Sequence, residues 1–215
     1  MVRFTDATGL ASAVAASAVL ALELPGIARL RRRHPALVLV TAVALILVPL
    51  GALPAAVYVR GGLGDLSITS MVLLLRGLLR PVFRWGPIDA KSRLALQVLM
   101  AVGGLVLYPP ALGLGRFDPY RWGYGDSGFT IALLLLATAA WFLRLHLATS
   151  CLALAVLAHA AGWYESRNLW DYLLDPLVST WGLSALLLRW AKTFSPPAPS
   201  DFASPPPARV TDAAS

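Results

Sequence analysis

Long apolar runs alternate with short polar segments along most of the chain. Several runs approach the roughly 20 residues that an α-helix needs to cross a hydrocarbon core of about 30 Å. The pattern predicts an all-α, polytopic integral membrane protein, a single helical bundle of about seven transmembrane helices. The predicted spans cover residues 9–24, 36–59, 66–79, 94–112, 129–142, 147–163 and 173–190.

Two of these runs leave the number of spans open. Residues 9–24 are rich in Ala, and residues 66–79 form a short run that Arg76 interrupts. The second run could instead lie in the interface as an amphipathic helix. In that case Arg80 would lie on the opposite side of the membrane from the arginines at 29–33, against the positive-inside rule. We therefore predict seven spans, with six as the alternative.

Prolines and glycines divide the predicted spans further. Pro49 and Pro54 lie inside the second span, where each removes a backbone donor and should kink or break the helix. The pair Gly103-Gly104 offers a smooth surface that another helix can approach closely. Asp175-Pro176 can be interpreted as the N-cap and first residue of the last helix, with 165–174 as a separate interfacial piece.

The domain organisation follows from the same pattern. Residues 1–194 are expected to form one transmembrane domain, with no separate soluble domain. Residues 195–215 are rich in Pro, Ala and Ser, so they cannot bury enough apolar surface to order themselves. We expect this tail to be disordered on the cytoplasmic side.

Composition supports the membrane interpretation. The 215 residues are 58% hydrophobic and only 13% charged, about half the charged share of a typical soluble domain. The net charge of +7 would suggest nucleic acid in a soluble protein. Here most Lys and Arg fall in alternate connections between the runs, so they are better explained as topology signals, and no nucleic-acid partner is expected. The lipid bilayer is the first expected partner.

The charge distribution also predicts an orientation. If the arginine-rich connections share the cytoplasm, most acidic residues lie outside, which favours an inner (plasma) membrane protein with its N-terminus outside and its C-terminus inside. The single cysteine, Cys151, lies in an apolar run, so an intramolecular disulfide and a cysteine metal site are excluded.

Polar and aromatic residues gather in three predicted outer loops, at about residues 64–67, 118–127 and 164–171. Short loops anchored by packed helices could converge on one patch. Carboxylates and Asn bind hydroxyl groups, and arginine forks hold phosphate, so the mixture suits a sugar or a lipid headgroup. Helix capping and the aromatic belt explain the same residues without any ligand. The candidate cluster comprises Asp65, Ser67, Asp118, Tyr120, Arg121, Asp126, His159, Glu165, Arg167, Asn168, Asp171 and Asp175.

Sharper catalytic signatures are missing from the sequence. There is no P-loop, no dinucleotide fingerprint, no HExxH and no paired-histidine spacing for haem, so no cofactor or metal is expected. His159 with Asp171 or Glu165 could bind a metal or act as an acid–base pair. A lone intramembrane histidine is more often hydrogen-bonded to a neighbouring helix.

Three functions remain open at this stage. The leading hypothesis is a non-catalytic accessory subunit of a cell-envelope machinery that handles lipid-linked or exported polysaccharide, with a membrane-protein partner. The alternative is an intramembrane enzyme or lipid-headgroup-handling protein that uses outer carboxylates such as Asp65, Glu165, Asp171 and Asp175. A third is a small-solute transporter, since broken helices line such pathways. The sequence does not decide whether the chain is an enzyme.

Overall fold

The computed structural model describes residues 33–51 and 53–194, together with Val14 and Ala18. Its helices are α3 (Pro35–Leu47), α4 (Ala55–Leu63), α5 (Ile68–Phe83), α6 (Ala90–Ala111), α7 (Ser127–Phe142), α8 (His146–Ala160), α9 (Leu169–Leu173) and α10 (Pro176–Thr193), with a 3₁₀ helix η1 (Pro119–Gly123). The strands β1 (Pro49–Leu50) and β2 (Leu53–Pro54) form a small antiparallel pair. Apart from Val14 and Ala18, the predicted first span at 9–24 lies outside the described residues, and so does the tail at 195–215.

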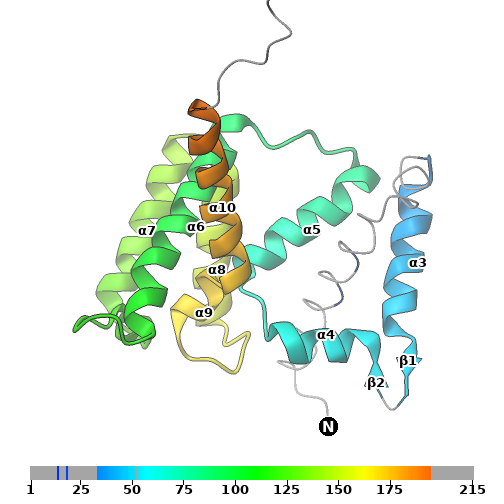
Figure 1. The fold of residues 1–215 in the computed structure, drawn as a ribbon, viewed down its shortest axis with the longest axis horizontal. Helices are drawn as coiled ribbons and strands as arrows, with labels where there is room; N and C mark the ends of the chain where they lie inside the picture. The colour runs from blue at the N-terminus through cyan, green and yellow to red at the C-terminus, as the bar shows by residue number, and fades with distance from the viewer. Residues whose placement is uncertain (1–13, 15–17, 19–32, 52, 195–215) are drawn as a thin grey trace, which may run out of the picture.

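Helices α6, α7, α8 and α10 stand side by side as a bundle (Figure 1). The most extensive packing is between α6 and α10, followed by α7 against α8. Helix α5 crosses from α8 toward α3 and connects the bundle with the N-terminal helices (Figure 1). The main core lies between these helices, with Leu96 and Met100 of α6 and Leu152 of α8 fully enclosed.

Two glycines explain the close packing of α6 and α10. A Cβ atom added at Gly182 would lie 2.7 Å from the backbone oxygen of Gln97 and 3.0 Å from the nitrogen of Ala101. One added at Gly104 would lie 2.7 Å from the Cβ of Ser179. All three distances are shorter than normal contacts of a Cβ atom, so only glycine allows the two helices to approach this closely. The expected close approach at Gly103-Gly104 is confirmed.

The predicted seven-span bundle is wrong. Among the described helices, only α6 is both long and apolar enough to cross a membrane. Helices α7 and α8 have 16 and 15 residues, roughly 24 and 22 Å at 1.5 Å per residue, short of a core of about 30 Å. Helix α5 also has only 16 residues.

The predicted second span fails for a backbone reason. Residues 36–59 are divided into α3, the β1–β2 turn and α4. Pro49 and Pro54 provide no N–H for a helical hydrogen bond, and Gly51 turns the chain between the two strands with φ +78°. The prolines were expected to kink or break this helix, and together with the glycine they end it and start another.

The last helix begins where the Asp175-Pro176 interpretation predicts. Asp175 is the N-cap of α10, Pro176 is its first residue, and α9 is a separate short helix before it. A single continuous helix through residues 165–175 is therefore excluded. The extended backbone of Leu174 and Asp175 separates the two helices.

Candidate functional site

The three predicted outer loops meet at one end of the bundle, where Asp175 connects the first of them to the start of α10. Asp175 is 6% exposed, and its Oδ2 accepts hydrogen bonds from the backbone N–H of Ser67 at 2.9 Å and from the Ser67 hydroxyl at 2.8 Å. Its Oδ1 accepts from the N–H of Val178 at 2.8 Å, which caps α10. A single carboxylate therefore caps one helix and holds the start of another that lies 108 residues earlier.

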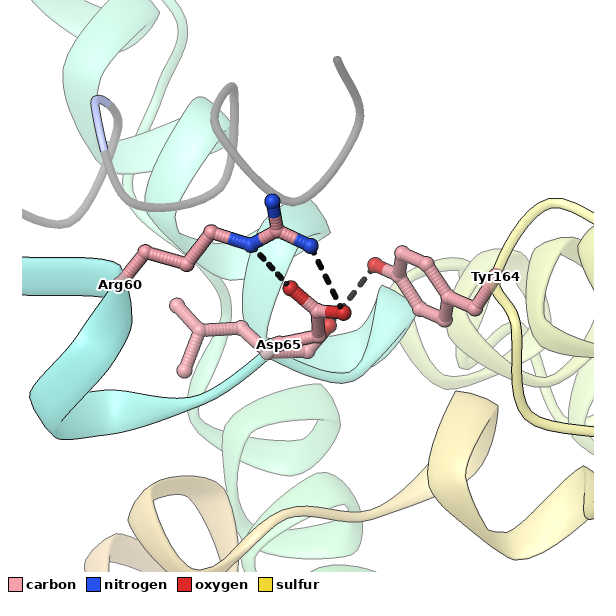
Figure 2. Close-up of polar contacts among 4 residues, drawn as sticks. Arg60, Asp65 and Tyr164 are labelled. Atoms are coloured by element: carbon pink, nitrogen blue, oxygen red, sulfur yellow. Dashed lines mark hydrogen bonds and ion pairs between the residues drawn. The ribbon is translucent and has the colours of Figure 1, made fainter. Parts of the chain in front are cut away.

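Tyr164 makes a second connection to the same early segment. Its hydroxyl donates to the carbonyl oxygen of Leu66 at 2.7 Å (Figure 2). Beside this contact, Arg60 of α4 holds Asp65 through two hydrogen bonds, Nε to Oδ1 at 2.8 Å and Nη2 to Oδ2 at 3.3 Å (Figure 2). Asp65 does not cap the following helix. Ser67 caps it instead, accepting from the N–H of Ser70 at 3.2 Å, because α5 begins later than predicted.

The loop around η1 is held by side chains of the connection between α8 and α10. Asn168 is fully buried, and its Nδ2 donates to the carbonyl oxygen of Tyr120 at 3.0 Å while its Oδ1 accepts from the N–H of Trp170. The indole of Trp170 donates to the carbonyl oxygen of Pro119 at 2.9 Å. A Cβ atom added at Gly123 would overlap the Asn168 side chain, so this close approach requires glycine.

Asp171 connects the same two segments through side chains. It accepts hydrogen bonds from the hydroxyl of Tyr120, at 3.1 Å to each oxygen, and from the hydroxyl of Ser166. The hydroxyl of Tyr172 binds the backbone of the same loop. It accepts from the N–H of Tyr164, and its single hydrogen is shared between the carbonyl oxygens of Tyr164 and Ser166. The connection is therefore a closed, hydrogen-bonded unit.

Burial changes the titration of these tyrosines. Loss of solvent raises the pKa of Tyr120 above its usual range, and the negative charge of Asp171 raises it further. The pKa of Tyr164 is raised in the same way, first by burial and then by Asp65. For Tyr172 burial raises the pKa, while the hydrogen bond with the backbone of Tyr164 partly opposes it. All three hydroxyls therefore remain protonated donors at neutral pH.

Other predicted site residues have local roles at the same end. Asp118 accepts from the N–H of Tyr120 and caps η1, and Asp126 accepts from the N–H of Phe129 and caps α7. No ion pair of the Arg121 or Arg167 guanidinium occurs among the described residues. Both arginines are exposed.

An open cavity of about 460 Å³ lies beside this hydrogen-bonded unit. It is lined by Tyr124, His159, Tyr164, Glu165, Ser166 and Arg167, with two glycines. The Nε2 of His159 lies 3.1 Å from the carbonyl oxygen of Arg167, and its ring meets that of Tyr172 edge to face. The described residues contain no group of three His, Cys, Asp or Glu side chains that could hold a metal ion. The cavity offers hydroxyl, carboxylate and guanidinium groups for a polar ligand.

Comparison of the chain with protein-family models, with curated proteins and with solved structures finds no match.

Sequence reasoning placed the loops together but missed several residues that hold them. Trp170, Tyr164 and Tyr172 were not among the candidate site residues, although their polar atoms make specific contacts with backbone groups. A buried Tyr or Trp usually needs a partner for its O–H or N–H. Several such residues within one short loop were a signal of a folded unit. The backbone carbonyls that accept from them left no signal in the sequence.

Proposed function

We propose that the chain is a membrane protein without catalysis of its own, an accessory subunit of a cell-envelope complex that handles lipid-linked or exported polysaccharide. The main support is that five carboxylates at the loop-bearing end are already used in holding the structure. Asp65, Asp118, Asp126, Asp171 and Asp175 each form an ion pair, a helix cap or a contact between loops. A catalytic carboxylate would instead need to face a substrate.

The apolar side chains on the outer surface of the bundle support the proposal that the protein lies in a lipid bilayer. Large apolar side chains are exposed along its helices, including Leu105 at 55%, Leu135 at 65%, Leu157 at 64% and Leu188 at 64%. Only 33% of the most apolar window of α6 is buried within the protein, whereas the core helix of a soluble protein would be mostly buried. Large apolar side chains exposed in such number indicate a lipid or protein covering.

The charges at the two ends of the bundle support an inner-membrane orientation. One end carries Arg93, Arg144, Arg189 and Lys192, around the start of α6 and α8 and the end of α10 (Figure 1). The opposite end carries the acidic loops. Under the positive-inside rule, the basic end and the end of α10 lie in the cytoplasm. The loop-bearing end would then face the outside, where exported polysaccharide is handled.

The loop-bearing end also has the features of a recognition surface. Its backbone is fixed by hydrogen bonds, so little ordering entropy would be lost on association. Aromatic side chains remain exposed on it, with Tyr124 at 61% and Trp122 at 40%. Rigid exposed aromatic residues are typical anchors of protein interfaces. A second membrane protein of the envelope is the partner that we propose for this surface.

Complementation of a deletion strain tests this function, with cell-surface polysaccharide as the readout. The triple variant Asp118→Asn, Asp126→Asn, Glu165→Gln removes three negative charges, while Asn keeps both helix caps. An accessory subunit should retain full function in this variant. Photo-crosslinking from position 124 should yield one discrete membrane-protein adduct, and crosslinking from position 135 on the apolar face should not. Loss of polysaccharide in the stably expressed variant would favour an enzyme over an accessory subunit.

The 460 Å³ cavity favours one alternative, the handling of a sugar or lipid headgroup at the same end. Its volume lies within the range of small-molecule sites. Under this alternative, Glu165→Gln and Arg167→Gln would each reduce function while the fold remains intact. If both variants retain full function, the cavity has no such role.

A further inference from the structure

A second polar cavity, of about 280 Å³, lies at the opposite, basic end of the bundle. It is lined by residues from α5, α6, α8 and the connection between α5 and α6, among them Arg76, Asp89, Ser92, His146 and Ser150. None of these residues belongs to the loop-bearing end. Its volume is near the lower limit of small-molecule sites, so it suits a ligand fragment rather than a large molecule.

Arg76 is positioned before any ligand arrives. Its Nη2 donates to the carbonyl oxygen of Gly86 at 3.2 Å, and its guanidinium carbon lies 5.8 Å from the centre of the Trp85 ring. Phe83 stacks on the Trp85 ring, with 5.3 Å between the ring centres, and holds it in place. These contacts use one N–H group and one face of the guanidinium. The remaining N–H groups have no hydrogen-bond partner in the described part of the chain.

Two further groups give the cavity donors for an anion. Helix α8 begins with His146, and no side chain caps its first turn, so its N-terminal dipole adds positive potential beside the imidazole. Ser92 also lines the cavity, from α6, but its donors are directed at Asp89. An uncapped helix start, a guanidinium and an imidazole in one cavity match the requirements of a phosphate group.

The cavity also contains one negative charge, which limits the choice of ligand. Asp89 caps α6 by accepting from the N–H of Ser92 at 2.8 Å, and hydrogen bonds from Ser92 hold the pKa of Asp89 below its usual range. Arg76 and Asp89 line the same cavity, yet they form no ion pair within 4 Å among the described residues. Two opposite charges that stay apart suit a ligand with separated charges of its own.

We propose that this cavity binds a phosphoethanolamine group, with the phosphate against Arg76 and the start of α8 and the ammonium against Asp89. Ser150 supports the second contact, because its hydroxyl donates to the carbonyl oxygen of His146 at 2.8 Å and keeps its own lone pairs for an ammonium. The group can come from a phosphatidylethanolamine headgroup or from a soluble phosphoethanolamine compound. The basic end lies at headgroup level if the bundle is embedded as proposed, but binding of the soluble compound would not depend on that placement.

Binding can be measured on the full-length protein in detergent. Native mass spectrometry with phosphatidylethanolamine, phosphatidylglycerol and phosphatidylcholine covers the lipid source, and calorimetry with O-phosphoethanolamine covers the soluble source. We expect preference for the ethanolamine compound in at least one arm. Arg76→Gln should weaken it about tenfold or more, since hydrogen bonds to charged groups are the strong ones. Asp89→Asn keeps the helix cap but should remove the preference for ethanolamine over glycerol.

Arg93→Gln is the matched control. Arg93 lies at the same end and also donates to a carbonyl oxygen of the connection, that of Ile88 at 3.1 Å, but it does not line the cavity. It should leave the affinity within about twofold of the wild type, because it removes only diffuse charge. Equal loss in Arg76→Gln and Arg93→Gln, or equal binding of the three lipids together with no binding of O-phosphoethanolamine, would overturn the proposal. Unchanged thermal unfolding shows that each variant is folded.

Discussion

Replacement of Asp175 by Ala should be far more damaging than the loss of an ordinary helix cap. The substitution removes the cap of α10, which costs about 0.5–2 kcal/mol. It also leaves the buried N–H of Ser67 without its acceptor, at about 1–3 kcal/mol. We expect a total of about 3–4 kcal/mol. For a chain of this size, that corresponds to a fall in unfolding temperature of about 6–16 °C.

Asp126→Ala provides the comparison within the same chain. Asp126 also caps an apolar bundle helix, accepting from the N–H of Phe129 at 3.0 Å, but the contact is exposed and reaches no other loop. Its loss should cost about 1 kcal/mol, or about 2–4 °C. The difference between the two variants therefore isolates the contact between the loops.

The assay is thermal unfolding in one detergent, followed by tryptophan fluorescence for the wild type and both variants. Asp175→Asn should fall between the wild type and Asp175→Ala, since its amide oxygen can still accept from one donor while its NH₂ group faces the other. If Asp175→Ala and Asp126→Ala lower the unfolding temperature equally, then Asp175 does not hold the loops together. A purely structural role of these carboxylates, on which the accessory-subunit proposal rests, would then lose its main support.

Three further predictions concern packing, pH and loop closure. Gly182→Ala should destabilise the protein by about 1–3 kcal/mol, because the new methyl group would meet backbone atoms of α6 that cannot move aside. Gly77 has open space around it, so Gly77→Ala should instead stabilise α5 by about 0.5–1 kcal/mol in the same unfolding assay. The pKa values of Tyr120 and Tyr164 are raised in the folded protein, so the stabilisation by their hydroxyls is fully present below about pH 10 and is lost as the pH rises above it. The unfolding temperature should therefore fall above about pH 10, and it should fall less steeply in Tyr120→Phe. Asn168→Ala should increase hydrogen exchange in residues 118–124 but not in α7, and equal exchange in both segments would contradict its role as the connector.

Much of the local structure could be predicted because its causes act within a few residues. Asp175-Pro176 marks the start of α10 through one side-chain oxygen and one fixed φ angle. Asp126 and Asp118 mark helix starts in the same way. Gly103-Gly104 marks a close helix contact because a missing Cβ atom is visible in any sequence. The convergence of the three loops was also expected, since short loops must follow the helices that they connect.

The number and length of helices could not be predicted in this way. Hydropathy reports the solvent that a segment prefers, but it does not report where the backbone hydrogen bonds stop. In residues 36–59 the composition remained apolar while Pro49, Gly51 and Pro54 ended one helix and began another. The prediction of seven spans failed at residues 36–59 because the apolar run was counted as one uninterrupted helix. It failed at α5, α7 and α8 because these helices are too short.

The sequence by itself determined an apolar, helical chain, the helix starts marked by Asp, and the separation of basic from acidic connections. Tertiary structure decided the partners. Asp65 pairs with Arg60, five residues earlier, instead of capping α5. Asp175 accepts from Ser67 because packing of α5 against α9 and α10 brings these groups together. Hydrogen bonds between groups about 100 residues apart depend on distances that only the folded helices set.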